Sequence, residues 1–292
     1  MGLQIKGISS ETLNHEDFYL SKIERALAKA KEKLKTQGQN NSPDFDIRGD
    51  LYRIALELAP NARAEELNSV LHLLKPKARE IGVDLAAGTG FLSLPVAVVT
   101  HTKLYAVDVS SEQLRSITSL SSHLIPVHAS PDSEAICKFI PTGTVDFITS
   151  LGGLHHVSDQ RQLFKNVTQL LKPKGRFVAA DVCADSKLSA HFDRVVSKKC
   201  ITGHEANWLS RKKIIELAAF NDLEPALCTQ IEPQWVFRNI RHACLFFKAL
   251  HAYDIPIEEI EADLRTELDV TEHADYLTIS WPLIIFELRK RG

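Results

Sequence analysis

The sequence predicts a doubly wound α/β domain with a mostly parallel seven-stranded sheet, one antiparallel strand and a helical cap. Three observations carry this prediction. Short apolar runs alternate with helical patterns from about residue 80 onward. The first of these runs ends in a glycine-rich turn that leads into a helix, and the second ends on Asp108. Strands and helices that alternate at this spacing form right-handed βαβ units around a parallel sheet.

Five apolar runs of strand length supply the first five strands of the sheet. The predicted strands are Glu80–Ala86, Lys103–Val109, His123–Ala129, Thr144–Leu151 and Gly175–Val182. Helical patterns lie between them, most clearly over Ser110–Leu120 and Gln160–Leu171. The second of these helices is closed by a turn that contains proline and glycine, residues that favour a turn.

The last third of the chain is expected to complete the sheet with two more strands. They are Leu223–Phe237 and Tyr276–Leu288, and we expect the second to be the antiparallel one. Pro282 interrupts it and lacks the N–H that a ladder needs, so we interpret it as a bulge or as a position that faces away from its neighbour. The helices expected in this third are Leu188–Lys199, Arg211–Phe220, Ile240–Leu250 and Ile257–Leu268.

Helical patterns also precede the predicted sheet, and we assign residues 1–75 to an N-terminal helical cap. The helices are Asp17–Lys35, Gly49–Leu58 and Ala62–Leu74, and a polar linker, Thr36–Pro43, follows the first. Residues 76–292 form the expected core, with a helical insertion at about 183–220. The cap and this insertion are expected to close over the site. Alternatively, these helices cover the sheet or build the interface of a homodimer.

Composition excludes several classes of function. The 292 residues are 44% hydrophobic and 25% charged, and the formal net charge is −2. No global field therefore draws the chain to nucleic acid or to an anionic membrane. The five cysteines are scattered without any C-x-x-C, so neither a disulfide framework nor a metal site is expected. We expect a cytoplasmic protein, because scattered cysteines fit a reducing compartment. No apolar run approaches the roughly 20 residues of a membrane span.

The most informative segment is the turn after the first predicted strand, Val83–Gly90. Its glycines let a ligand approach the backbone, and the following helix offers free N–H groups. Asp108 ends the next strand, 20 residues after Gly88. A carboxylate at that place can accept the ribose hydroxyls of a nucleoside. The segment therefore predicts a nucleoside-binding site.

Two kinds of ligand fit this turn. Gly88-x-Gly90-x-x-Ser93 is close to the dinucleotide fingerprint, which would indicate a nucleotide-dependent oxidoreductase. Asp84 favours another ligand, because an acid directly ahead of the loop suits a cation and opposes a pyrophosphate. S-adenosylmethionine carries an amino group and a sulfonium and has no phosphate. A non-catalytic binding protein on the same fold remains a further alternative.

The segment Asp84–Gly90, DLAAGTG, resembles motif I of the class I S-adenosylmethionine-dependent methyltransferases. It is most similar to the small-molecule enzymes that include the ubiquinone and menaquinone methyltransferases. The resemblance covers Ile81–Val182 and includes VDFITSLGGLHHV and KPKGRFV. It implies a Rossmann-like fold, S-adenosylmethionine as cofactor, and methyl transfer to oxygen, nitrogen or carbon of a small metabolite, with no nucleic acid or membrane as partner.

The resemblance also implies roles for individual residues. Gly88 and Gly90 would lie beneath the cofactor, Asp84 would help to hold its amino group, and Asp108 would bind its ribose. Ala86 stands where the family usually has a glycine.

Three further positions complete the expected cofactor site. The family usually has an acid after the third strand that meets the adenine. Ser130 aligns with it here, and Asp132 follows two residues later. Leu151 ends the fourth strand, where ligands of an open α/β sheet bind.

Three histidines are candidates for chemistry. Methyl transfer depends mainly on alignment of the reactants, and a general base helps when the acceptor must lose a proton. His155 and His156 follow the fourth strand, and histidine titrates near neutral pH. His204 lies in the insertion, beside Glu205 and near Trp208. Alternatively, these histidines cap a helix or pack under the cofactor.

Overall fold

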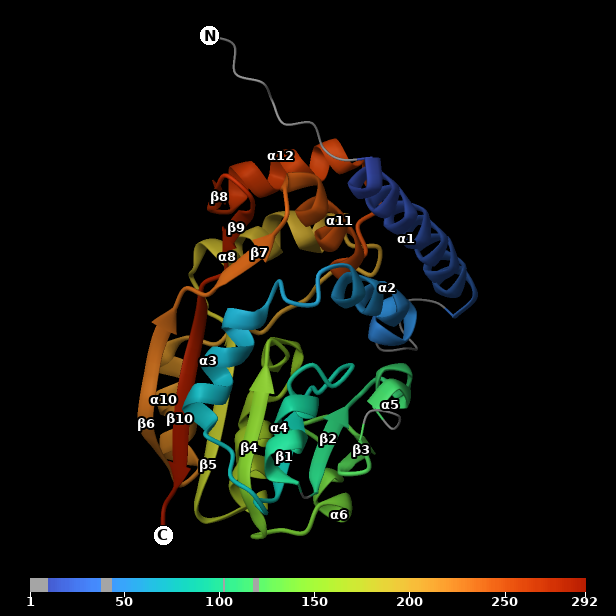
Figure 1. Cartoon of the computed structure of the whole chain (residues 1–292). Coiled ribbons are helices and arrows are strands. Elements are labelled where there is room, and N and C mark those ends of the chain that lie inside the picture. Colours follow the sequence, from blue (N-terminus) through green and yellow to red (C-terminus); the bar gives the residue numbers. More distant parts are fainter. Residues whose placement is uncertain (1–9, 38–43, 102, 118–120) are drawn as a thin grey trace.

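The computed structural model describes residues 10–37, 44–101, 103–117 and 121–292 (Figure 1). Within them, the main sheet has seven strands in the order β3-β2-β1-β4-β5-β10-β6. The strands are β1 (Gly82–Leu85), β2 (Leu104–Asp108), β3 (Leu124–His128), β4 (Val145–Leu151), β5 (Leu171–Val182), β6 (Leu223–Ile231) and β10 (Leu283–Lys290). Strands β1 to β5 are parallel to one another, and β10 is antiparallel to β5 and β6. The predicted sheet is confirmed.

Helices cover both faces of this sheet because its strands are apolar on both sides. In β5, Phe177 and Ala179 face one core cluster, and Val178 and Ala180 face the other. The first face is covered by α6 (Ile136–Phe139), α7 (Gln160–Leu170) and α10 (Arg211–Phe220). The opposite face is covered by α3 (Ala64–Leu74), α4 (Ser93–Thr100) and α5 (Ser111–Ile117).

The prediction of one strand over Tyr276–Leu288 is wrong. The segment forms two strands, β9 (Leu277–Ser280) in a small second sheet and β10 in the main sheet. The chain leaves one sheet for the other at Trp281 and Pro282, where proline cannot donate to a ladder. Trp281 instead donates its backbone N–H to the carbonyl of Pro233 at 2.9 Å.

The predicted strand Leu223–Phe237 divides in the same way. It forms β6 in the main sheet and β7 (Gln234–Phe237) in the small sheet, whose order is β7-β9-β8 with β8 (Val270–Glu272). The alternation of side chains continues across the break, so periodicity alone does not reveal the change of sheet. The stacked rings of Trp235 and Trp281, 3.8 Å apart, join the two places where the chain crosses over.

A cap of helices and the small sheet lies over the carboxyl ends of the parallel strands (Figure 1). Its helices are α1 (Ser10–Gln37), α2 (Asp44–Leu58), α8 (Lys187–His191), α9 (Ser197–Lys199), α11 (Ile240–Leu250) and α12 (Ile257–Glu267). A π-helical turn, Phe192–Val196, joins α8 to α9. The insertion predicted at about 183–220 is therefore only partly in the cap. Its helices α8 and α9 belong to the cap, whereas its last helix, α10, packs on the sheet. Residues 38–43 of the predicted linker lie outside the described residues.

Hydrogen bonds tie the cap to the sheet at two places. Oδ1 of Asp46 in α2 accepts from Oγ of Ser110 at 2.6 Å, at the end of β2. The buried ion pair of Arg63 and Glu66 lies on α3, and Glu66 also accepts from Nε1 of Trp235 at 2.7 Å. A buried charge must be paired, so these contacts hold α3 and the small sheet together.

Among the described helices, none is both long enough and apolar enough to cross a bilayer.

Gly82 gives a test of the packing at the first strand. A Cβ there would lie 2.2 Å from Cζ of Phe147 and 2.8 Å from Cδ1 of Leu104, both fully buried. We expect Gly82→Ala to lower the free energy of unfolding by about 1–3 kcal/mol because the core has no room for the methyl group. Urea denaturation measures this loss. Gly49→Ala is the control, because its Cβ would meet Gln113 only at 3.5 Å. Equal effects would contradict the prediction.

Candidate active site

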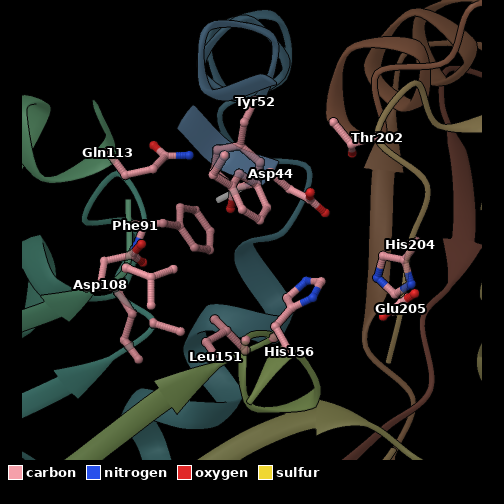
Figure 2. Close-up of a pocket in the computed structure, with 18 of the residues that line it drawn as sticks. Asp44, Tyr52, Phe91, Asp108, Gln113, Leu151, His156, Thr202, His204 and Glu205 are labelled. Carbon is pink, nitrogen blue, oxygen red and sulfur yellow. The ribbon is translucent and has the colours of Figure 1, made fainter. Parts of the chain in front are cut away.

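A cavity of about 710 Å³ opens where the carboxyl ends of β1, β2 and β4 meet helix α2 (Figure 2). Small-molecule sites commonly have volumes of roughly 300–1,000 Å³. What we name the strand half is lined by Asp84, Ala86, Gly88, Phe91, Asp108, Gln113 and Leu151. What we name the histidine half is lined by Asp44, Phe45, Tyr52, His156, Thr202, His204 and Glu205.

The turn after β1 forms the floor of the strand half. Ala86, Gly88 and Gly90 all have positive φ angles, of 55°, 54° and 89°. Glycine adopts such angles without strain, and Ala86 adopts one although it has a side chain. A Cβ at Gly88 would meet nothing within 4 Å, so its glycine leaves the backbone open toward the cavity.

Asp108 links this turn to the end of β2. Its Oδ2 accepts from the backbone N–H of Gly88 and its Oδ1 from that of Ser110, each at 2.8 Å. Burial raises the pKa of Asp108, and the two backbone donors partly offset that rise. The carboxylate is therefore held in place at the cavity wall by the loop that it supports.

Asp84 is the most deeply buried acid of the strand half. It is 1% exposed, and its Oδ2 accepts from Oγ of Ser93 at 2.5 Å. Burial raises the pKa of Asp84 to about 7, and the negative charge of Asp108 adds to the rise. A buried carboxylate is costly unless a positive charge meets it, so this place suits a cationic group.

The loop after β4 packs directly on the turn after β1. A Cβ at Gly153 would lie 2.4 Å from Cβ of Ala86, so only glycine permits this close approach. The chain then forms a short 3-10 helix, Leu154–His156, which carries two of the predicted histidines. The strand half therefore fixes where these histidines lie.

His155, His156 and His204 come together in the structure. The ring centroids of His155 and His156 are 4.1 Å apart, and His204 lies 5.0 Å from His156 and 5.4 Å from His155. His156 and His204 line the cavity and face each other across the histidine half (Figure 2). His155 lies behind them, where its Nδ1 donates to Oδ1 of Asp181 at 2.6 Å.

Desolvation inside the cavity keeps the two histidines that line it, His156 and His204, neutral. It lowers the pKa of His156 well below its usual value, and the neighbouring histidines and Arg48 add to the effect. The pKa of His204 falls to about 3 for the same reasons, with burial the largest. Both imidazoles are therefore uncharged at neutral pH and carry a lone pair that can accept a proton or a ligand.

The predicted residues divide between the cavity wall and its surroundings. Asp84, Ala86, Gly88, Asp108, Leu151, His156 and His204 line the cavity. Gly90 supports the turn from below, where its N–H donates to the carbonyl of Ala87 at 2.9 Å. Ser130 donates to Asp132, and Asp132 accepts from the backbone of Asp159 at 2.9 Å. The roles of Ser130 and Asp132 at the adenine stay predictions.

Sequence reasoning missed the wall that α2 contributes. Asp44 and Tyr52 project from α2 into the cavity, and Phe91 and Gln113 enter from the opposite side (Figure 2). Phe45 of α2 also lines the cavity. The sequence could have indicated Gln113, because it lies five residues after Asp108, at the start of the helix that follows β2. The residues of α2 carried no motif, and the packing of α2 on α1, α5 and α11 brings them to the site.

The chain from β1 to β5 matches the family model of a methyltransferase domain over residues 83–179. The match covers about a third of the chain. It supports the predictions of a class I methyltransferase and of S-adenosylmethionine as its cofactor. The match favours them over a nucleotide-dependent oxidoreductase.

Individual relatives are distant. An O-methyltransferase, cnsE of Penicillium expansum, is 21% identical over 182 residues, which are 60% of this chain and 61% of the relative. The YcgJ protein of Bacillus subtilis has the same fold, with a TM-score of 0.58 at 17% identity over 78% of this chain and 99% of that one.

Geranyl diphosphate C-methyltransferase of Streptomyces coelicolor also shares the fold. Its structure is a complex with Mg²⁺, geranyl diphosphate and S-adenosyl-L-homocysteine. The TM-score is 0.51 at 14% identity, over 78% of this chain and 77% of that one. At this distance the likeness shows the fold alone.

The residues of the strand half fit S-adenosylmethionine. Asp84 is a buried carboxylate whose one side-chain donor is a neutral hydroxyl, so it lacks the positive partner that the cofactor's amino group would provide. Asp108 is oriented by backbone donors at the cavity wall, where it would accept the ribose hydroxyls. Gly88 leaves the space above the turn open.

Asp108→Ala tests the ribose contact. Hydrogen bonds to a charged group contribute about 1.5–3 kcal/mol each, so we expect binding of S-adenosylmethionine to weaken roughly 10–100-fold. Isothermal titration calorimetry measures this change. Asp269→Ala is the control, because that acid lies on the surface and pairs with Lys187. Unchanged affinity in Asp108→Ala would refute the assignment.

Asp84 predicts a pH dependence of cofactor binding. Its pKa of about 7 means that the free protein takes up a proton at this carboxyl as pH falls below 7. Only the carboxylate attracts the amino group, so affinity should fall about tenfold per pH unit below 7 and level off above it. Calorimetry between pH 5 and pH 8.5 measures the profile. Asp84→Asn should bind more weakly at high pH and lose this dependence; a parallel profile in the variant would contradict the assignment.

Proposed function

We propose that this protein transfers the methyl group of S-adenosylmethionine to an oxygen atom of a small molecule held in the histidine half of the cavity. The cofactor supplies a methyl group already activated on a sulfonium. The observation that carries the proposal is the pair of neutral imidazoles of His156 and His204 that line the cavity wall. A hydroxyl acceptor must lose a proton, and these groups face the place where that loss occurs.

The position of the β4 loop supports a role at the point of transfer. Gly153 packs against Ala86 of the cofactor turn, and His156 follows three residues later. The chain therefore places His156 at the boundary between the two halves of the cavity (Figure 2). Alignment of this kind accounts for much of the rate of a displacement reaction.

Helix α2 supports a closed acceptor site. Asp46 joins α2 to Ser110 and to the backbone of Glu112 on the cofactor side. From the same helix, Phe45 and Tyr52 line the histidine half, where their rings stand 5.7 Å apart at 88°. These aromatic walls suit an acceptor with an apolar ring and exclude water from the sulfonium.

The choice of oxygen rests on the chemistry of the site and on one relative. An aromatic amine keeps its lone pair at neutral pH and needs no base before attack, so it would make less use of two neutral histidines than a hydroxyl would. The distant relative cnsE is an O-methyltransferase. The resemblance to ubiquinone and menaquinone methyltransferases, a small-molecule acceptor without nucleic acid, and a homodimer stay predictions.

A screen with isotope-labelled methyl donor tests the proposal. The protein is incubated with S-adenosylmethionine and a fractionated set of hydroxylated ring compounds, and labelled products are identified by mass spectrometry and nuclear magnetic resonance. We expect an O-methyl product. A labelled methyl group on nitrogen or carbon would overturn the choice of atom, and cofactor binding without turnover on any fraction would favour the non-catalytic alternative.

His156→Ala should separate binding from turnover. Loss of a group that removes the acceptor proton lowers kcat by about 10²–10⁴-fold, while the cofactor contacts of Asp84 and Asp108 remain. Steady-state kinetics and calorimetry measure the two effects. His72→Ala is the control, because that histidine is exposed on α3. Equal turnover in the two variants would show that His156 has no part in the reaction.

A further inference from the structure

Three nitrogen atoms converge at the wall of the histidine half. One nitrogen from each of His155, His156 and His204 lies within 4.8 Å of the other two. The first two rings come from the 3-10 helix after β4, and the third comes from the segment between α9 and α10, 48 residues later in the chain. Clusters of three imidazoles of this kind are ligand sets for transition metals.

The rings are oriented from behind, as the ligands of a metal site are. Nδ1 of His155 donates to Asp181, which leaves Nε2 of this ring with a free lone pair. His156 donates to the backbone of Glu205, which leaves its other nitrogen free in the same way. Nδ1 of His204 is buried and has no partner among the described residues. A carboxylate behind a metal-binding histidine fixes both its tautomer and its direction.

The surroundings combine an apolar shell with an excess of negative charge. The ring centroid of Phe192 lies 4.8 Å from that of His204, and the ring centroid of Trp208 lies 5.1 Å from that of His155. Aromatic rings that do not line the cavity therefore pack against the cluster. On the cavity side, Asp44 and Glu205 line the wall.

Among the residues that the structure describes, Arg48 is the positive group that acts on the cluster. Arg48 stacks over Phe45 at 4.3 Å and contributes to the lowered pKa of His156 and of His204. It opposes the binding of a proton or a cation, and the two carboxylates of Asp44 and Glu205 offset it.

We propose that His155, His156 and His204 bind a divalent transition-metal ion such as Zn²⁺, with its open position turned toward the histidine half of the cavity. Zn–N distances of about 2.0–2.1 Å place tetrahedral ligands roughly 3.3 Å apart, so each nitrogen moves by about 1 Å on binding.

The ion gives the acceptor a direct partner, and this part of the inference rests on the proposed function. With the ion bound, His156 and His204 promote loss of the acceptor proton through the metal and not as direct bases. A hydroxyl at the open position loses its proton more readily, because a bound cation lowers the pKa of its ligand. The O–H bond breaks, the electron pair stays on oxygen and the proton leaves to solvent. That oxygen forms the new O–C bond while the S–C bond of the cofactor breaks, so the sulfonium becomes a neutral thioether.

The inference departs from the expectation of no metal site that the sequence alone supports. Adjacent histidines with a third 48 residues away match no common ligand spacing, and the cysteines take no part. The ligand set is visible only because the β4 loop and the segment before α10 meet. A hydrogen bond joins the two segments: the backbone N–H of Asn207 donates to the carbonyl of His155 at 2.7 Å.

Metal binding is measured first on the unaltered protein. Protein stripped with a chelator is titrated with Zn²⁺ and with Co²⁺, and bound metal is counted by plasma mass spectrometry after removal of the excess. We expect about one ion per chain, the visible spectrum of four-coordinate Co²⁺, and X-ray absorption at the zinc edge that fits three imidazole ligands. Binding below one ion per five chains, or fewer than two imidazoles, overturns the inference.

Variants then assign the site. His204→Ala should weaken Zn²⁺ binding by at least 100-fold, and Asp181→Asn, which removes the orienting charge, by about 10–100-fold. His72→Ala is the matched control for surface histidines and should bind Zn²⁺ as the unaltered protein does. Affinity for S-adenosylmethionine, measured by calorimetry, confirms that each variant is folded. Equal Zn²⁺ affinity in His204→Ala and His72→Ala would overturn the site.

The two proposals fail in different ways. Full O-methylation by a metal-free protein would overturn the metal's role and leave the proposed function standing. Zn²⁺ bound by the three histidines without any methylated product would support the site and count against the function. Turnover that is lost with the chelator and restored by Zn²⁺ supports both.

Discussion

The buried carboxylate of Asp181 is the constraint on which the candidate site depends. It lies at the carboxyl end of β5 and is fully buried. It accepts from the backbone N–H groups of Leu154, His155 and Val182 at 2.7, 3.1 and 2.7 Å, and from the ring of His155. Hydrogen bonds from this many donors offset the desolvation penalty of a buried carboxylate, and loss of one of them would be strongly destabilising. It therefore fixes the loop after β4 relative to β5, and the position of the histidines follows.

From this anchor the site grows outward in both directions. On one side the β4 loop packs through Gly153 on the turn after β1, so the place where the cofactor would lie and the place of the histidines are mechanically one unit. On the other side the ring of His155 packs on Trp208, and Asn207 pairs with the carbonyl of His155. The cap then adds α2 across the opening. Catalysis by positioning requires such rigidity, because small displacements of the reacting groups cost rate.

Local patterns in the sequence were sufficient for the core and for the cofactor turn. Asp84, Gly88 and Asp108 belong to strands and turns whose pattern is complete within a few residues, so their geometry could be predicted. The division of β9 from β10 could not be predicted, because alternation continues through Trp281 and only the partner strands differ. The walls of the histidine half are also non-local. Phe45 reaches the cavity through the packing of α2 on α1, α5 and α11, and no spacing in the chain records those contacts.

Burial under the cap sets the charge state in both halves of the cavity. It raises the pKa of Asp84 and lowers the pKa of His156 and of His204, so each group is driven toward its neutral form. Burial is the largest cause of each of these shifts. The cavity therefore presents little positive charge of its own, and each half gains most from a ligand that brings positive charge. The cationic cofactor meets this condition beside Asp84, and a metal ion meets it beside the histidines. One fold feature thus prepares two different sites for ligands of the same sign, and the acceptor is bound between them.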